Sequence, residues 1–182
     1  MTSHHSDVEF TKIKDHTYLL SFDLTSNTFD ISQLLTFDLI HLLYRLNATL
    51  FQTIDVQITP DYTECCIFTI FKHILEDFGL PQRFSNTKIT RHQLSPTHIQ
   101  FVSKTQPTIE PQYLHLLSQD MELVKIDNAV VDCVIQSSHH VSISCTLVFS
   151  MDMEIPEFVE KILSNIIKTL FRRLRTNIAQ CS

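Results

Sequence analysis

Residues 152–180, DMEIPEFVEKILSNIIKTLFRRLRTNIAQ, form the stretch of sequence that decides the fold. Pro156 suits the first turn of a helix, where a missing N–H group costs nothing. After it, apolar residues recur every four positions in two columns, and polar residues occupy the opposite side. The columns are Phe158, Ile162, Ile166, Leu170, Leu174 and Ile178, and beside them Val159, Leu163, Ile167 and Phe171. The pattern predicts one long amphipathic helix.

A strand with a two-residue period precedes this helix. Its apolar positions are Val141, Ile143, Cys145, Leu147 and Phe149, with serine or threonine at most positions between them. Such alternation is typical of an antiparallel strand with one face in the core and the other in water. Residues 136–140 read as a turn, which places this strand beside an extended segment over residues 122–136.

The rest of the chain predicts a mixture of strands and helices. Strands are expected at residues 18–24, 84–94 and 97–105, and a short helix is expected to begin at Pro111. Two longer helices are predicted between the first two of these strands, over residues 30–51 and 61–78. The predicted fold class is α+β: an antiparallel sheet packed on a long C-terminal helix, with two helices inserted after the first strand.

Start and stop signals support the two inserted helices. Asp30 with Gln33, and Asp61 with Glu64, have the spacing of a capping box, in which the two residues satisfy free N–H groups at a helix start. Gly79 stands where the second helix would end, because glycine readily adopts the left-handed conformation of a helix stop.

The first inserted helix has a second apolar side. Phe37, Ile40, Tyr44 and Phe51 lie where an ordinary surface helix carries polar residues. Two interpretations follow: the helix is sandwiched between two layers of the fold, or this side is a surface that meets a partner.

Composition sets broad limits on the function. The chain has 182 residues, of which 43% are hydrophobic and 19% charged, as in a folded globular protein. We expect a polar tail at residues 1–7 and a single α+β domain at 8–182. The net charge of −6 argues against nucleic-acid binding. No signal peptide, transmembrane run or paired cysteine motif is visible, so we expect an intracellular, cytoplasmic protein with reduced thiols.

The residue types and spacings exclude several kinds of chemistry. The chain has one glycine, Gly79, whereas phosphate-binding loops, dinucleotide fingerprints and nucleophile elbows each need more than one. The histidines and cysteines show no metal-ligand spacing, so we expect neither a metal nor a cofactor. No catalytic constellation is apparent, and a non-enzymatic role is favoured over an enzyme.

The order of elements resembles the helix-grip fold of the START-like superfamily, which includes Bet v 1. The similarity is carried by Val141–Phe149 followed by Pro156–Gln180. It implies a curved antiparallel sheet around a long terminal helix, with a hydrophobic ligand cavity between them. The residues expected to face that cavity are Ile143, Cys145, Leu147, Phe158, Ile162, Ile166 and Leu170. The same residues could instead close a dry core.

Two functional hypotheses follow. By the resemblance, the protein binds a lipid or another apolar small molecule without catalysis. The alternative is a protein-interaction or scaffold protein with a dry core, using the side of the first helix that carries Phe37 and Tyr44. An oligomeric state, and a viral or other accessory origin, would fit that alternative.

Overall fold

The computed structural model describes residues 7–181. The polar tail predicted for residues 1–7 therefore lies outside the described residues except for Asp7. In the described part of the chain the strands are β1 Glu9–Lys14, β2 Thr17–Thr25, β3 Phe51–Ile58, β4 Glu64–Phe71, β5 Arg83–Ser95, β6 His98–Thr105, β7 Glu122–Leu123, β8 Ile126–Ser137 and β9 His140–Phe149. The helices are α1 Phe37–Leu46, α2 Pro111–Leu114 and α3 Glu157–Gln180, with short 3-10 turns η1 Ile31–Leu34, η2 Ala48–Leu50 and η3 Glu76–Phe78.

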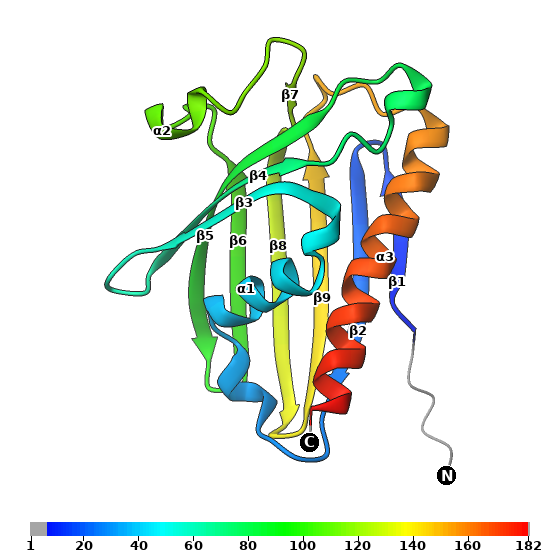
Figure 1. The fold of residues 1–182 in the computed structure, drawn as a ribbon. Coiled ribbons are helices and arrows are strands. Elements are labelled where there is room, and N and C mark those ends of the chain that lie inside the picture. Colours follow the sequence, from blue (N-terminus) through cyan, green and yellow to red (C-terminus); the bar gives the residue numbers. More distant parts are fainter. Residues whose placement is uncertain (1–6, 182) are drawn as a thin grey trace.

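The strands form a single sheet in the order β1-β2-β9-β8-β6-β5-β4-β3. Neighbours along this path are antiparallel, and the short β7 pairs in parallel with β5. Figure 1 shows the sheet curving around α1 and α3, which lie on the same face. The predicted fold class, an antiparallel sheet packed on a long C-terminal helix, is confirmed.

The second inserted helix is a wrong prediction, because residues 64–71 form strand β4. Cys65 and Ile67 belong to the core on the concave face of the sheet, and Phe68 and Ile70 belong to a second core on the convex face. All four are at most 1% exposed. A strand buried on both faces has no polar alternation, so its apolar run cannot be distinguished from a buried helix by periodicity.

The residues around β4 that resemble helix start and stop signals, Asp61 and Gly79, lie in turns and not at the ends of a helix. The carboxylate of Asp61 accepts hydrogen bonds from the backbone N–H of Thr63 and from the hydroxyl groups of Thr59 and Thr63, which closes the β3–β4 hairpin. Gly79 has φ +66°, in the left-handed region, and ends the short turn η3. The glycine stop was predicted correctly, but it follows a 3-10 turn.

The first inserted helix is shorter than predicted. Asp30 caps the turn η1, and the chain then restarts at Thr36, whose hydroxyl accepts from the N–H of Asp38 (3.2 Å). This second cap begins α1, which ends at Leu46. Phe51, expected in the helix, is the first residue of β3.

The second core lies where the segment between β6 and β7 folds back over the convex face. Tyr113 of α2 stacks on Phe68, with ring centroids 4.1 Å apart and planes 2° from parallel. Its hydroxyl donates to Asp55 and accepts from the side-chain amide of Gln57. This cover explains why β4 is apolar on both sides.

A buried amide joins α1 to α3. Asn47, which is 0% exposed, follows the last residue of α1. Its Nδ2 donates to the carbonyl oxygens of Leu43 (2.8 Å) and Leu170 (3.4 Å). Its Oδ1 accepts from Arg173 (3.3 Å). The C-terminal half of α3 is therefore held against α1 by polar contacts as well as by buried Leu174 and Ile178.

Replacing Asn47 with alanine should lower the free energy of unfolding by about 2 kcal/mol, since it removes several buried hydrogen bonds that contribute about 0.5–1.5 kcal/mol each. The matched control is Asn165→Ala on the exposed side of α3, which should change stability by less than about 0.5 kcal/mol. Urea denaturation of both variants measures the difference. Equal stability of the two variants would contradict this role for Asn47.

Candidate functional site

A cavity of about 260 Å³ lies between the N-terminal half of α3 and the sheet. Its wall from α3 consists of Val159, Ile162, Leu163, Ile166, Ile167 and Leu170. The sheet side contributes Phe51, Phe71, Val124, Ile126 and Phe149, and loops contribute Leu75, Leu80 and Met153 among others. Apolar side chains thus make up most of the wall. The volume of the cavity is just below the usual lower end for ligand pockets, about 300 Å³.

The middle of α3 explains why this space is open. Val159, Leu174 and Ile178, near the two ends of the helix, are buried. Ile162, Ile166 and Leu170 between them are only half-buried, although they point to the same interior. The helix is packed at its ends and faces unfilled space in its middle.

The segment between β4 and β5 covers one end of the cavity. Lys72, His73, Leu75 and Leu80 of this segment line the wall. Phe78 in η3 meets Phe158 at the start of α3, with ring centroids 5.4 Å apart. Both rings remain exposed, at 59% and 43%. An aromatic contact at the protein surface therefore joins this covering segment to the start of α3.

Within the described residues, the polar side chains that line the cavity are exposed or half-buried, and three of them have partners; the full set is Lys72, His73, Gln82, Arg83 and Glu154. Gln82 donates to Gln52 (2.8 Å) and to the carbonyl oxygen of Phe71 (2.7 Å). Arg83 forms an ion pair with Glu122. His73 Nε2 lies 2.6 Å from the carbonyl oxygen of Leu80.

Within the described residues no group of histidine, cysteine and acidic side chains has the arrangement of a metal site. Over the same part of the chain, no helix has the length and apolar character needed to span a membrane.

Comparisons with known proteins agree with this architecture. The sequence matches no family model and no curated protein. Solved structures do match. The human StarD13 (DLC2) lipid transfer and protein localization domain superposes with a TM-score of 0.66 at 14% identity, covering 97% of this chain and 86% of that one.

Two further human structures show the same arrangement. STARD10 has a TM-score of 0.60 at 9% identity, over 94% of this chain and 72% of its own. StAR-related lipid transfer protein 5 has a TM-score of 0.59 at 6% identity, over 95% and 86%. This chain has the START-like helix-grip fold. At such low identity the likeness concerns the fold alone, and it confirms the resemblance inferred from the order of elements.

The START-like fold places the predicted cavity residues in three different settings. Ile162, Ile166 and Leu170 are on the cavity wall. Phe158 lies at the surface against Phe78. Of the residues on β9, Ile143 is buried in the main core, and Cys145 and Leu147 are half-buried beyond the lining of the cavity. Contact of these residues with a ligand stays a prediction.

Of the four residues considered as a partner surface, two are buried and two are half-buried. Phe37 is 1% exposed and its ring meets that of Phe101, with centroids 6.1 Å apart. Phe51 is 7% exposed and lines the cavity. Ile40 and Tyr44 are half-buried and pack on the main core. Phe37 and Phe51 thus offer no surface to a partner, and packing between α1 and the sheet accounts for the second apolar side.

Partial burial in the START-like fold changes the pKa of two side chains, Tyr44 and Cys145. Burial raises the pKa of the Tyr44 hydroxyl and the Cys145 thiol, each to about 12. Burial likewise raises the pKa of Cys133 on the neighbouring strand to about 12. These thiols are protonated at neutral pH, which makes them weak nucleophiles.

Sequence reasoning missed the cavity residues that come from loops and strand ends. Phe71, Leu80 and Met153 lie far apart in the sequence and meet only in the folded chain. Phe149 could have been predicted from the sequence, because it is the last inward-facing position of the alternating strand β9.

A carboxylate anchors the cavity half of α3 to the sheet. Glu160 Oε1 accepts from Lys12 Nζ and from the Tyr18 hydroxyl, both at 2.7 Å. The bond from Lys12, and then that from Tyr18, lowers the pKa of Glu160 below its ordinary value of 4.5. Burial, with the bond to Glu160 second, raises the pKa of Tyr18 to about 12. This contact holds α3 against β1 and β2 beside the open space.

Glu160→Gln should lower the free energy of unfolding near neutral pH by about 1 kcal/mol or less, the range for a partly exposed ion pair. Because folding lowers the pKa of Glu160, its contribution is complete above the ordinary glutamate pKa and is lost as the pH falls through the lower folded value. The difference in the free energy of unfolding between wild type and variant should therefore shrink as the pH is lowered from about 7 into the acid range. The control Glu76→Gln, at an exposed position in η3, should show no such pH-dependent difference. A wild-type-to-variant difference that does not change with pH would contradict the assignment.

Proposed function

We propose that this protein binds a hydrophobic small molecule in the cavity between α3 and the sheet. The observation that carries the proposal is the half-buried middle of α3. Ile162, Ile166 and Leu170 face about 260 Å³ of apolar space that the chain's own side chains leave unfilled. Burying apolar surface stabilises a complex by about 25 cal/mol per Å² removed from water.

The comparisons support the same proposal. StarD13 and the StAR-related protein 5 are named as lipid transfer proteins, and they share the architecture of this chain over at least 95% of its length. A lipid or another apolar ligand is therefore the class of molecule that we assign to the cavity. The proposal requires no catalytic group, and it accounts for the predominantly apolar lining of the cavity.

The chain contains no tryptophan, which allows a direct test. Ile166→Trp places an indole ring on the cavity wall, where it should fill part of the space and emit at short wavelength. Asn165→Trp places the same ring on the exposed side of α3 and should emit as in water. Titration with nonanol, an uncharged probe, should give binding to wild type and to the Asn165 variant. Binding by the Ile166 variant should fall by at least about tenfold.

Two outcomes would count against the proposal. One is solvent-like emission from Ile166→Trp, because the ring would then not enter the cavity. The other is equal nonanol binding by both tryptophan variants. Native mass spectrometry of the purified protein gives an independent readout, since an apolar molecule that co-purifies with wild type should be absent from the Ile166 variant.

A further inference from the structure

The cavity lining includes one lysine, Lys72, whose ammonium group has no side-chain partner among the described residues. Among the described residues on its wall, the basic side chains are Lys72, His73 and Arg83. Arg83 is paired with Glu122, and His73 is bonded to the carbonyl oxygen of Leu80. The Lys72 ammonium group forms no ion pair or side-chain hydrogen bond within residues 7–181, and it is exposed.

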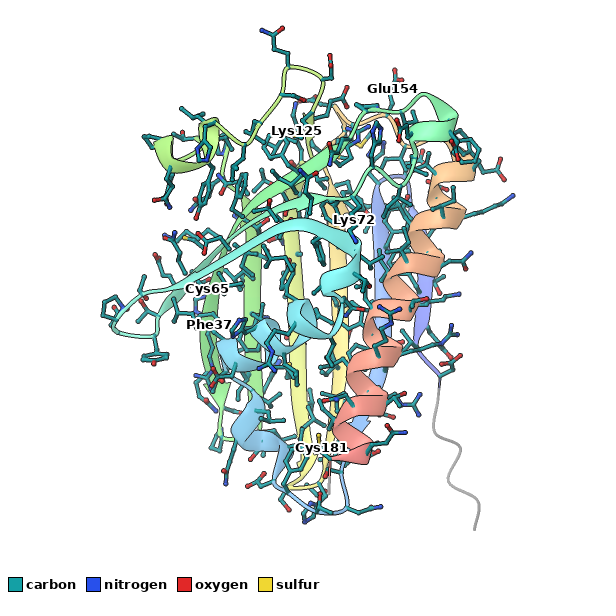
Figure 2. All side chains as sticks on the ribbon, viewed as in Figure 1. Phe37, Cys65, Lys72, Lys125, Glu154 and Cys181 are labelled. Carbon is teal, nitrogen blue, oxygen red and sulfur yellow. The ribbon has the colours of Figure 1, made fainter. Side chains whose placement is uncertain are left out.

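Lys72 stands at the boundary between the apolar wall and water. It follows Phe71, the last residue of β4, and its backbone N–H donates to the carbonyl oxygen of Leu50 (3.0 Å). Phe71 and Phe51, whose ring centroids are 5.1 Å apart, form the wall next to it. The backbone of Lys72 is thus fixed at the end of β4, and its exposed side chain, labelled in Figure 2, lies at the edge of the cavity lining.

The volume of the cavity limits the size of the ligand. At about 260 Å³, the cavity lies just below the volume of about 300 Å³ at which ligand pockets usually begin. A ligand with one short apolar chain therefore suits the cavity better than a ligand with two long chains.

We propose that the cavity selects single-chain amphiphiles with an anionic head group, and that Lys72 binds the head. The inference rests on the proposed function and adds the chemical class of its ligand. The chain lies among Ile162, Ile166 and Leu170, and the carboxylate or other anionic group meets the ammonium group at the edge. A charge-assisted hydrogen bond of this kind is stronger than one between neutral groups.

Glu154 allows a second test, in which removing a charge should strengthen the binding of an anionic head group and not weaken it. This exposed carboxylate also lies on the cavity wall, just before α3, and no ion pair joins it to Lys72 within the described residues (Figure 2). Its charge disfavours an anionic head group, so its removal should favour one.

The experiment compares three probes of equal chain length, nonanoate, nonanol and nonyltrimethylammonium, by titration calorimetry at low salt. Wild type should bind nonanoate most tightly and the cation most weakly. Lys72→Met should bind nonanoate about tenfold more weakly, a change of about 1.4 kcal/mol, and should bind nonanol as before. Lys104→Met, which removes an exposed lysine of β6 away from the cavity, is the matched control and should leave all three affinities unchanged. Glu154→Gln should bind nonanoate more tightly than wild type.

Equal affinity of wild type for nonanoate and nonanol would overturn the inference while leaving the proposed function intact. Unchanged nonanoate binding by Lys72→Met would do the same. Failure of wild type to bind any of the three probes would overturn both. Because Lys72 is exposed, its replacement should leave the thermal unfolding curve unchanged, which separates loss of binding from loss of folding.

Discussion

The arrangement of this protein depends on how α3 is held. Asn47, fully buried at the end of α1, donates to a backbone oxygen of α3 and accepts from Arg173 on the next turn. At the other half of the helix, Glu160 receives hydrogen bonds from Lys12 and Tyr18 of the first two strands. Because polar contacts fix both halves, the helix does not need complete apolar packing in between. The cavity occupies that middle stretch.

This division separates stability from binding. Side chains that hold the fold, such as Leu174 and Ile178, are buried against α1 and the sheet. Side chains available to a ligand, such as Ile162 and Ile166, lie roughly two to four turns away on the same helix. A four-residue repeat advances about 40° per step on a helix with 3.6 residues per turn, so one apolar column passes from the cavity to the core. A single sequence pattern thus serves both purposes.

Periodicity in the sequence correctly predicted helices and strands that have one apolar and one polar face. It gave a wrong prediction for a strand that is apolar on both faces. Strand β9 and helix α3 each have one apolar and one polar side, and their periods were clear. Strand β4 is apolar on both sides because Tyr113 and its neighbours cover the convex face. That cover comes from the segment between β6 and β7, far from β4 in the sequence. For the site, periodicity placed Ile162, Ile166 and Leu170 together on one side of the helix. It could not show that Phe158 lies outside against Phe78, since that depends on a loop from another part of the fold.

The unfilled space also has a mechanical consequence. A protein that encloses a cavity occupies more volume than its atoms require, and unfolding removes that excess. Hydrostatic pressure therefore favours the unfolded chain, in proportion to the void that is eliminated. A molecule seated beside α3 would remove the void from the folded state itself. The folded protein should therefore become less compressible when a chain is bound beside α3.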